Sequence, residues 1–153
     1  MKRLPPFGQA ILITTVFSTI LVTLAGAGAG DLNLQAKLIW ATNGDKPNDQ
    51  DLKEVDPKTA EKLGGVFKWK SYYEVSRTNF TVAAATTKTV KMSPKCDVKV
   101  SNQGKSQLEV ELYGKGKMVV RKRQQLAVGE LLVLAGDDKN DTAWFVIMNL
   151  NDR

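Results

Sequence analysis

Apolar and polar residues alternate with a period of two through most of this chain, in short runs that turn residues separate. In one run, Leu108, Val110 and Leu112 alternate with polar neighbours. Successive side chains of a β-strand point to opposite faces of a sheet, so this alternation is typical of half-buried strands. About eight such runs predict a mainly β fold, an antiparallel β-sandwich or a partly open barrel, with one short helix. The predicted strands cover residues 34–41, 72–82, 87–92, 96–101, 107–112, 117–126, 131–135 and 142–150.

The one predicted helix begins after Asp56. Aspartate is a good N-cap because its carboxylate accepts hydrogen bonds from the free N–H groups of the first turn. Pro57 suits the first helical position, where the missing N–H has no consequence. Ala60 and Leu63 lie at helical spacing, and Gly64 and Gly65 give a stop signal. We expect a short amphipathic helix that lies on the sheet.

Residues 1–29 have the pattern of a signal peptide. Positive charge at Lys2 and Arg3 comes first, an uncharged run over 10–25 follows, and small residues come last. This order predicts export to the periplasm or the extracellular space, with cleavage after Ala27 or Ala29. An uncleaved membrane anchor is the alternative, although the apolar run is shorter than the ~20 residues that a spanning helix needs. For the remaining residues, 30–153, we expect a single β-rich domain.

Histidine is absent and Cys96 is the only cysteine. These facts exclude serine–histidine and cysteine–histidine catalysis, the usual zinc sites and an intramolecular disulfide, and we expect no cofactor. Cys96 precedes alternating valines, which indicates a buried strand residue; a reactive thiol or an intermolecular bridge is the alternative. Hydrolysis by a pair of carboxylates stays possible, because glycosidases use only Asp and Glu.

A basic row is predicted on one strand, where Lys117, Arg121 and Arg123 alternate and so share a face. Such a row is a candidate binding site for phosphates, acidic sugars or an acidic partner. The alternative is a solvated face, or an edge strand charged to prevent pairing with another edge. Nucleic acid is not expected as a partner, because exported proteins seldom meet it and the leader predicts export. In addition, the part of the chain after the leader is only mildly basic: its formal charge is about +4, because two of the positive residues behind the total of +6 lie in the leader.

Lys68, Trp69 and Lys70 form a second candidate ligand site. An aromatic ring flanked by lysines can stack on sugars or bases, or lie under a cation. The alternative is that Trp69 packs where the helix meets the sheet.

A hydrophilic turn over 136–141 joins two apolar runs and predicts a buried hairpin. Its carboxylates, Asp137, Asp138 and Asp141, are candidates for a calcium site. The helical-hand calcium loop needs Gly at position six and Glu at position twelve, but counting from Asp138 these are Ala143 and Asn149. A turn rich in Asp and Asn is also expected for backbone reasons alone.

Three stretches, 52–58, 66–70 and 129–146, resemble a family of small exported bacterial proteins of unknown function, and the likeness covers most of the domain. The resemblance implies no activity. We expect a non-enzymatic binding or assembly module of the cell envelope or a secreted one. Its partner would be an unknown protein or an anionic envelope polymer. The protein itself would contact the membrane only through an uncleaved leader. A carboxylate-based hydrolase acting on a glycan and a calcium-dependent adhesion module are the alternatives.

Overall fold

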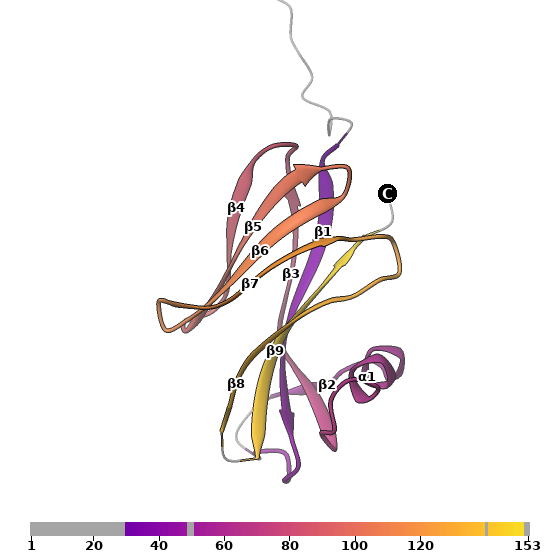
Figure 1. Cartoon of the computed structure of the whole chain (residues 1–153). Helices are drawn as coiled ribbons and strands as arrows, with labels where there is room; N and C mark the ends of the chain where they lie inside the picture. The colour runs from indigo at the N-terminus through magenta and orange to yellow at the C-terminus, as the bar shows by residue number, and fades with distance from the viewer. Residues whose placement is uncertain (1–29, 49–50, 140, 152–153) are drawn as a thin grey trace, which may run out of the picture.

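The structure, a computed structural model, describes residues 30–48, 51–139 and 141–151. The predicted signal peptide, 1–29, lies outside the described residues. Two antiparallel sheets pack face to face (Figure 1), so the predicted β-sandwich is confirmed. Among the described residues, no helix is both long and apolar enough to cross a membrane.

The larger sheet has five strands in the order β2-β3-β1-β9-β8. The two-residue strand β2 is additional to the expected strands. The strand β8 lies at the edge of the sheet and continues past the apolar run, so the predicted turn over 136–141 is shorter than expected. The bounds are β1 Leu32–Thr42, β2 Lys53–Glu54, β3 Ser71–Val82, β8 Leu132–Lys139 and β9 Thr142–Leu150.

The smaller sheet has four strands in sequence order, joined by tight turns. The β5–β6 turn is at Lys105 and Ser106, and both residues have positive φ. The bounds are β4 Thr87–Ser93, β5 Cys96–Gly104, β6 Gln107–Gly114 and β7 Lys117–Gln125.

The main core lies between the two sheets and consists of the apolar residues that the alternation predicted. Leu34 and Ala36 of β1 and Val110 and Leu112 of β6 belong to this core, and all four are fully buried. Asn102 is buried at one end of this core, and its amide donates to the carbonyl oxygens of Gly30 and Val82. These bonds satisfy a polar group that would be costly to bury alone.

A second apolar cluster lies on the outer face of the larger sheet, beneath the helix α1 (Pro57–Gly64). Leu63 of α1 is 1% exposed and packs with Ile39, Phe145 and Ile147 of the sheet. The helix therefore lies on the sheet as predicted.

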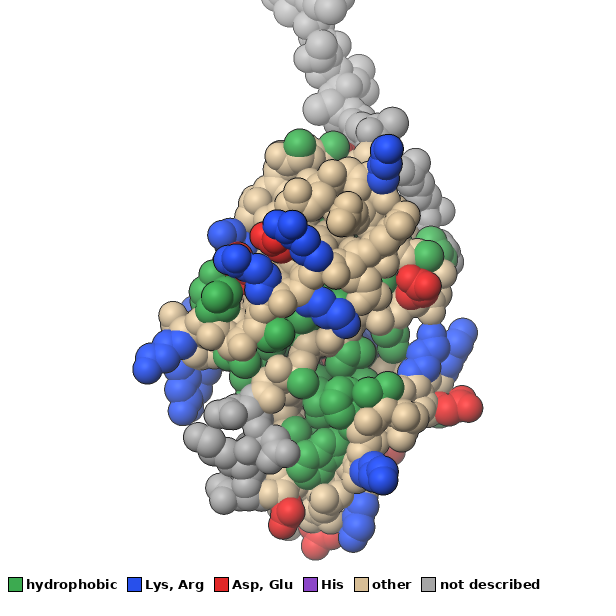
Figure 2. Space-filling model, viewed as in Figure 1, with side chains coloured by type: hydrophobic (Ala, Val, Ile, Leu, Met, Phe, Trp, Pro, Cys, Tyr) green, Lys and Arg blue, Asp and Glu red, His purple; other side chains and the backbone are tan. Residues whose placement is uncertain are grey.

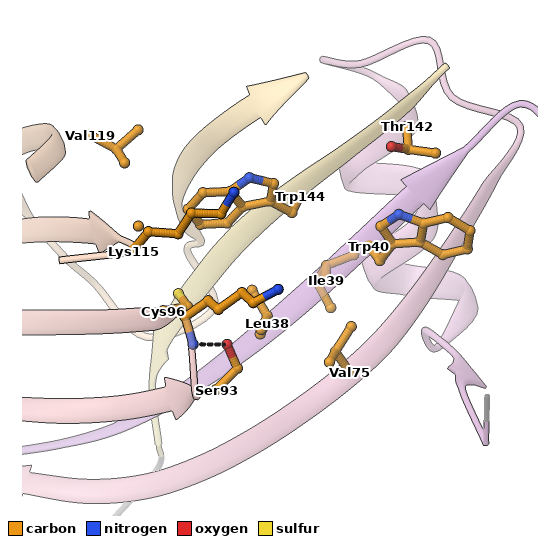
Figure 3. Close-up of a pocket in the computed structure, with 12 residues that line it drawn as sticks. Leu38, Ile39, Trp40, Val75, Ser93, Cys96, Lys115, Val119, Thr142 and Trp144 are labelled. Atoms are coloured by element: carbon orange, nitrogen blue, oxygen red, sulfur yellow. Dashed lines mark hydrogen bonds between the residues drawn. The ribbon is translucent and has the colours of Figure 1, made fainter. Parts of the chain in front are cut away.

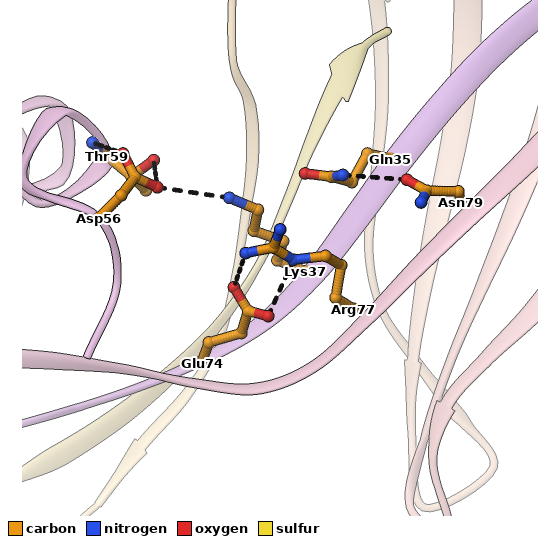
Figure 4. Close-up of polar contacts among 7 residues, drawn as sticks. All are labelled: Gln35, Lys37, Asp56, Thr59, Glu74, Arg77 and Asn79. Carbon is orange, nitrogen blue, oxygen red and sulfur yellow. Dashed lines mark hydrogen bonds and ion pairs between the residues drawn. The ribbon is translucent and has the colours of Figure 1, made fainter. Parts of the chain in front are cut away.

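The predicted N-cap of α1 is also confirmed. One carboxylate oxygen of Asp56 accepts from the Thr59 N–H at 2.9 Å, and the other accepts from the Thr59 hydroxyl at 2.7 Å. Lys37 of β1 reaches the same carboxylate at 3.4 Å, which ties the helix to the sheet (Figure 4). Beside it, Glu74 and Arg77 form a bidentate pair on β3.

Replacing Asp56 by Ala should destabilise the fold by about 1–2 kcal/mol, because the cap bonds and the Lys37 contact are lost together. Asp56→Asn should retain most of the cap and lose only the charge. The measurement is the urea midpoint at constant m-value. Asp45→Ala is the control, since Asp45 is exposed and makes no hydrogen bond within the described residues; an equal loss there would contradict the assignment.

The same cap predicts a pH dependence. The hydrogen bond from the Thr59 hydroxyl, helped by Lys37, lowers the pKa of Asp56 below 3.8. Because the folded pKa is the lower one, the carboxylate contributes its full stability above pH 3.8 and loses that contribution as pH falls through the folded value. The stability difference between wild type and Asp56→Ala should therefore shrink below that pH, and a difference that stayed constant would contradict the cap.

Candidate functional site

A groove of about 710 Å³ opens between the two sheets at one end of the sandwich (Figure 3). One wall comes from the turns β4–β5 and β6–β7, which contribute Lys95 and Lys115. The other wall is the inner face of the larger sheet, which extends beyond the smaller one. Leu38 is the last residue of β1 that the smaller sheet covers, at 6% exposed, and Trp40 follows on the same face.

Aromatic rings form the floor of the groove. Trp40 of β1 lies directly opposite Trp144 of β9, and residues opposite one another across strands point to the same face. Both rings are partly exposed. On the other side of Trp40, Tyr73 of β3 lies with its ring centroid 5.9 Å away, and the ammonium group of Lys46 lies 5.9 Å from the Tyr73 centroid.

Two glycines make room for the indole of Trp144. A Cβ on Gly136 of β8 would lie 2.1 Å from the indole Cε2, so the ring lies against the bare backbone of that strand. A Cβ on Gly114 of β6 would lie 3.3 Å from the indole Cζ2. Trp144 thus bridges the smaller sheet and the edge strand of the larger one, and Gly136 is required for this placement.

Four of the five register shifts among the described strands lie near the groove; the fifth, after Asn102 in β5–β6, lies at the other end of the smaller sheet. The β1–β3 ladder shifts at Leu38, where Val75 is the extra residue, and the β6–β7 ladder shifts at Leu112, where Val119 is the extra residue. Further shifts occur after Lys91 in β4–β5 and after Ala135 in β8–β9. Bulges bend strands and redirect side chains, and here Val75 and Val119 both line the groove.

Apart from two hydroxyls, two ammonium groups and the N–H groups of the two indoles, the side chains of the lining are apolar. Leu38, Ile39, Val75, Cys96 and Val119 supply most of the wall. The hydroxyls belong to Ser93 and Thr142, and no Asp or Glu is among the described residues that line the groove. Such a surface can hold an apolar group but contains no acid–base pair for chemistry.

The predicted basic row is divided in the structure. Arg121 pairs with Glu111 at 2.5 Å and Arg123 with Glu109 at 2.5 Å, both on the outer face of the smaller sheet. Lys117 lies opposite Gly114, one residue out of phase, because the bulge at Val119 intervenes. The prediction that Lys117 shares a face with the two arginines is therefore wrong.

The carboxylate of Glu111 is the centre of this polar network. It accepts from the Tyr113 hydroxyl at 2.6 Å and contacts Lys99 at 3.5 Å as well as Arg121. The Tyr113 bond and the Arg121 guanidinium lower the pKa of Glu111. Together, Glu111 and Glu109 pair with both arginines of the row, so this face matches the solvated alternative.

Trp69 packs against the second apolar cluster on the outer face of the larger sheet, where Figure 2 shows hydrophobic side chains beside α1. Lys68 and Lys70 are exposed, and the Lys70 N–H donates to the Asn43 side chain at 3.2 Å. The alternative, packing where helix meets sheet, describes Trp69 well. The two predicted sites are separate: Arg121 and Arg123 lie on the smaller sheet, whereas Lys68, Trp69 and Lys70 lie in the loop before β3 of the larger sheet.

The predicted calcium site is only partly within the described residues. The side chains of Asp137 and Asp138 lie outside them. Asp141 has a φ of +56°, and its carbonyl oxygen accepts from the Asn43 N–H at 3.2 Å, which is a turn role. The described residues hold no group of three His, Cys, Asp or Glu side chains placed to bind a metal ion.

Sequence reasoning missed the groove, although some of its residues carried a signal. Trp40 and Trp144 continue the inward-facing phase of their strands. Lys95 and Lys115 occupy two tight turns that antiparallel order places at the same end of a sheet. The bulges could not be predicted from the sequence, because a bulge depends on how two strands pair.

Cys96 should react slowly with thiol reagents. The side chain is 4% exposed, and burial, helped by the charge of Asp97, raises the pKa of its thiol to about 11. At pH values below this pKa, the rate of modification by iodoacetamide should rise about tenfold for each unit by which the pH is increased, because the thiolate is the reactive form. Denatured protein is the control; equal rates for folded and denatured protein at pH 8 would indicate the reactive thiol instead.

Gly136→Ala should displace the indole of Trp144, because the new Cβ has no room beside the ring. We expect a red shift in tryptophan emission and a lower unfolding midpoint. Gly64→Ala is the control, since a Cβ there meets nothing within 4 Å. Unchanged emission in Gly136→Ala would contradict the placement of Trp144.

Comparisons of the chain with protein-family models, curated proteins and solved structures found no significant match. The resemblance to a family of small exported bacterial proteins therefore stays a prediction. The chemistry of the groove alone supports a functional conclusion.

Proposed function

We propose that this protein is an exported, non-enzymatic β-domain of the cell envelope, or a secreted one, that binds an apolar ligand in the groove between its sheets. The pattern of residues 1–29 supports export. The observation that carries the binding function is an apolar groove with a floor made of Trp40 and Trp144.

The size and lining of the groove favour a small ligand. Ligand sites in proteins commonly enclose about 300–1,000 Å³, and most are apolar with a few polar groups that orient the ligand. The groove has a volume of about 710 Å³ and fits this description. The aromatic rings of the groove are partly exposed and can contact a ligand directly. The arginines of the basic row would first have to give up their ion pairs with Glu111 and Glu109.

A glycan hydrolase is less well supported. Such an enzyme needs two carboxylates on either side of the bond, one with a raised pKa so that it can act as the acid. The described lining of the groove contains neither Asp nor Glu. Glu109 and Glu111 lie close in sequence on the outer face, but each is ion-paired and the pKa of Glu111 is lowered.

The test is binding of N-phenyl-1-naphthylamine, an uncharged apolar dye, to a Trp69→Phe variant. Trp40 and Trp144 are then the only tryptophans left in the chain, so their emission reports the groove. We expect saturable binding at one site per chain, with energy transfer from the indoles to the dye.

Val119→Asp should weaken dye binding strongly, because it places a charge in the apolar wall. Val119 is 43% exposed, so the fold should tolerate the change. Val128→Asp is the matched control, at an exposed valine outside the groove lining. Absent dye binding, or equal losses in both variants, would remove the groove as the binding site.

A further inference from the structure

We infer that the ligand of this groove is an anionic amphiphile, a molecule with one acyl chain and a carboxylate or phosphate head group that binds Lys95 and Lys115. This inference rests on the proposed function and specifies its ligand. It places the head group at the turns of the smaller sheet and the chain over the two tryptophans.

The two lysines come from neighbouring turns. The backbone N–H of Lys115 donates to the carbonyl oxygen of Lys95 at 2.8 Å, so the β4–β5 and β6–β7 turns are directly joined. Figure 3 shows the Lys115 side chain pointing toward Trp144. Two ammonium groups at one rim attract an anion, and the low dielectric of an apolar wall strengthens that attraction.

Neither ammonium group is neutralised by a carboxylate among the described residues. By contrast, Arg121 and Arg123 are held by Glu111 and Glu109 on the other face of the same sheet. The described lining carries no acidic residue, so its charge is positive only. A neutral ligand would leave this charge unused, and a cation would be repelled.

The wall between the lysines and the tryptophans favours an acyl chain over a sugar. A sugar ring has several hydroxyl groups, and each hydroxyl that is removed from water needs a partner. Besides the N–H groups of the two indoles, the lining has the hydroxyls of Ser93 and Thr142. The Ser93 hydroxyl already accepts from the Lys95 N–H at 3.2 Å, and Thr142 already has an interaction of its own. Leu38, Val75 and Val119 offer only apolar contact, which suits methylene groups.

The experiment compares two probes that share one chain. Dodecanoate carries a carboxylate, and 1-monododecanoylglycerol carries an uncharged head group on the same chain. Each is titrated below its micelle concentration into the Trp69→Phe chain, with fluorescence and calorimetry as readouts. We expect dodecanoate to bind about tenfold more tightly than the neutral probe, and acetate, the head group alone, to show no measurable binding.

Charge reversal locates the head group. Lys95→Glu and Lys115→Glu should each weaken dodecanoate binding about tenfold and change binding of the neutral probe by less than about twofold. Lys105→Glu is the matched control, because Lys105 has the same positive φ as Lys115 but lies in the turn at the opposite end of the sheet. Lys115→Gln, with a smaller expected effect, is used if the Glu variant fails to fold by circular dichroism.

The outcomes separate the two proposals. Equal binding of both probes, or equal effects of all three Glu variants, overturns the anionic ligand while the groove remains a binding site. Absence of binding by both probes and by the uncharged dye overturns the proposed function itself. Vesicles of phosphatidylglycerol test the source: capture that Lys95→Glu and Lys115→Glu reduce indicates a bilayer lipid, and dodecanoate binding without vesicle capture indicates a free amphiphile.

Discussion

The apolar contact between the two sheets is shorter than the strands that supply it, and the rest of the structure depends on this mismatch. The strands β1 and β3 have 11 and 12 residues, whereas β4 and β6 have 7 and 8. Where the smaller sheet ends, the inner face of the larger one must either be capped or meet solvent. Trp144 closes part of the gap by lying on Gly136 and against Gly114, and the groove is the part left open.

Much of the fold could be predicted because burial alternates along strands that face the main core, such as β5 and the first half of β1. Leu108, Val110 and Leu112 are fully buried, as their spacing predicted, and the N-cap at Asp56 was visible in the residue types alone. The irregular features could not be predicted in the same way. The bulge at Val119 depends on how β7 pairs with β6, and a single inserted residue there moved Lys117 to the opposite face from Arg121.

The candidate site was harder to predict because charge pairing and burial are tertiary properties. Arg121 and Arg123 appear as an open basic row in the sequence, but neighbouring strands place a carboxylate beside each one. Their partners Glu109 and Glu111 had the matching alternation on β6, so a pairing of consecutive strands would have suggested neutralisation. The burial of Cys96 was predicted from its place before alternating valines, and the structure agrees.

The hydrogen bond from the Lys115 N–H to the Lys95 carbonyl oxygen has a further consequence for recognition. It fixes the separation of two backbone positions that come from hairpins remote from each other in the chain. The scaffold for the two cations is thus organised before any molecule arrives, and only the lysine side-chain torsions remain to be ordered on association. Loss of conformational entropy is one of the main terms that oppose binding, so this cross-link between turns lowers the entropic penalty of capturing a single negative group.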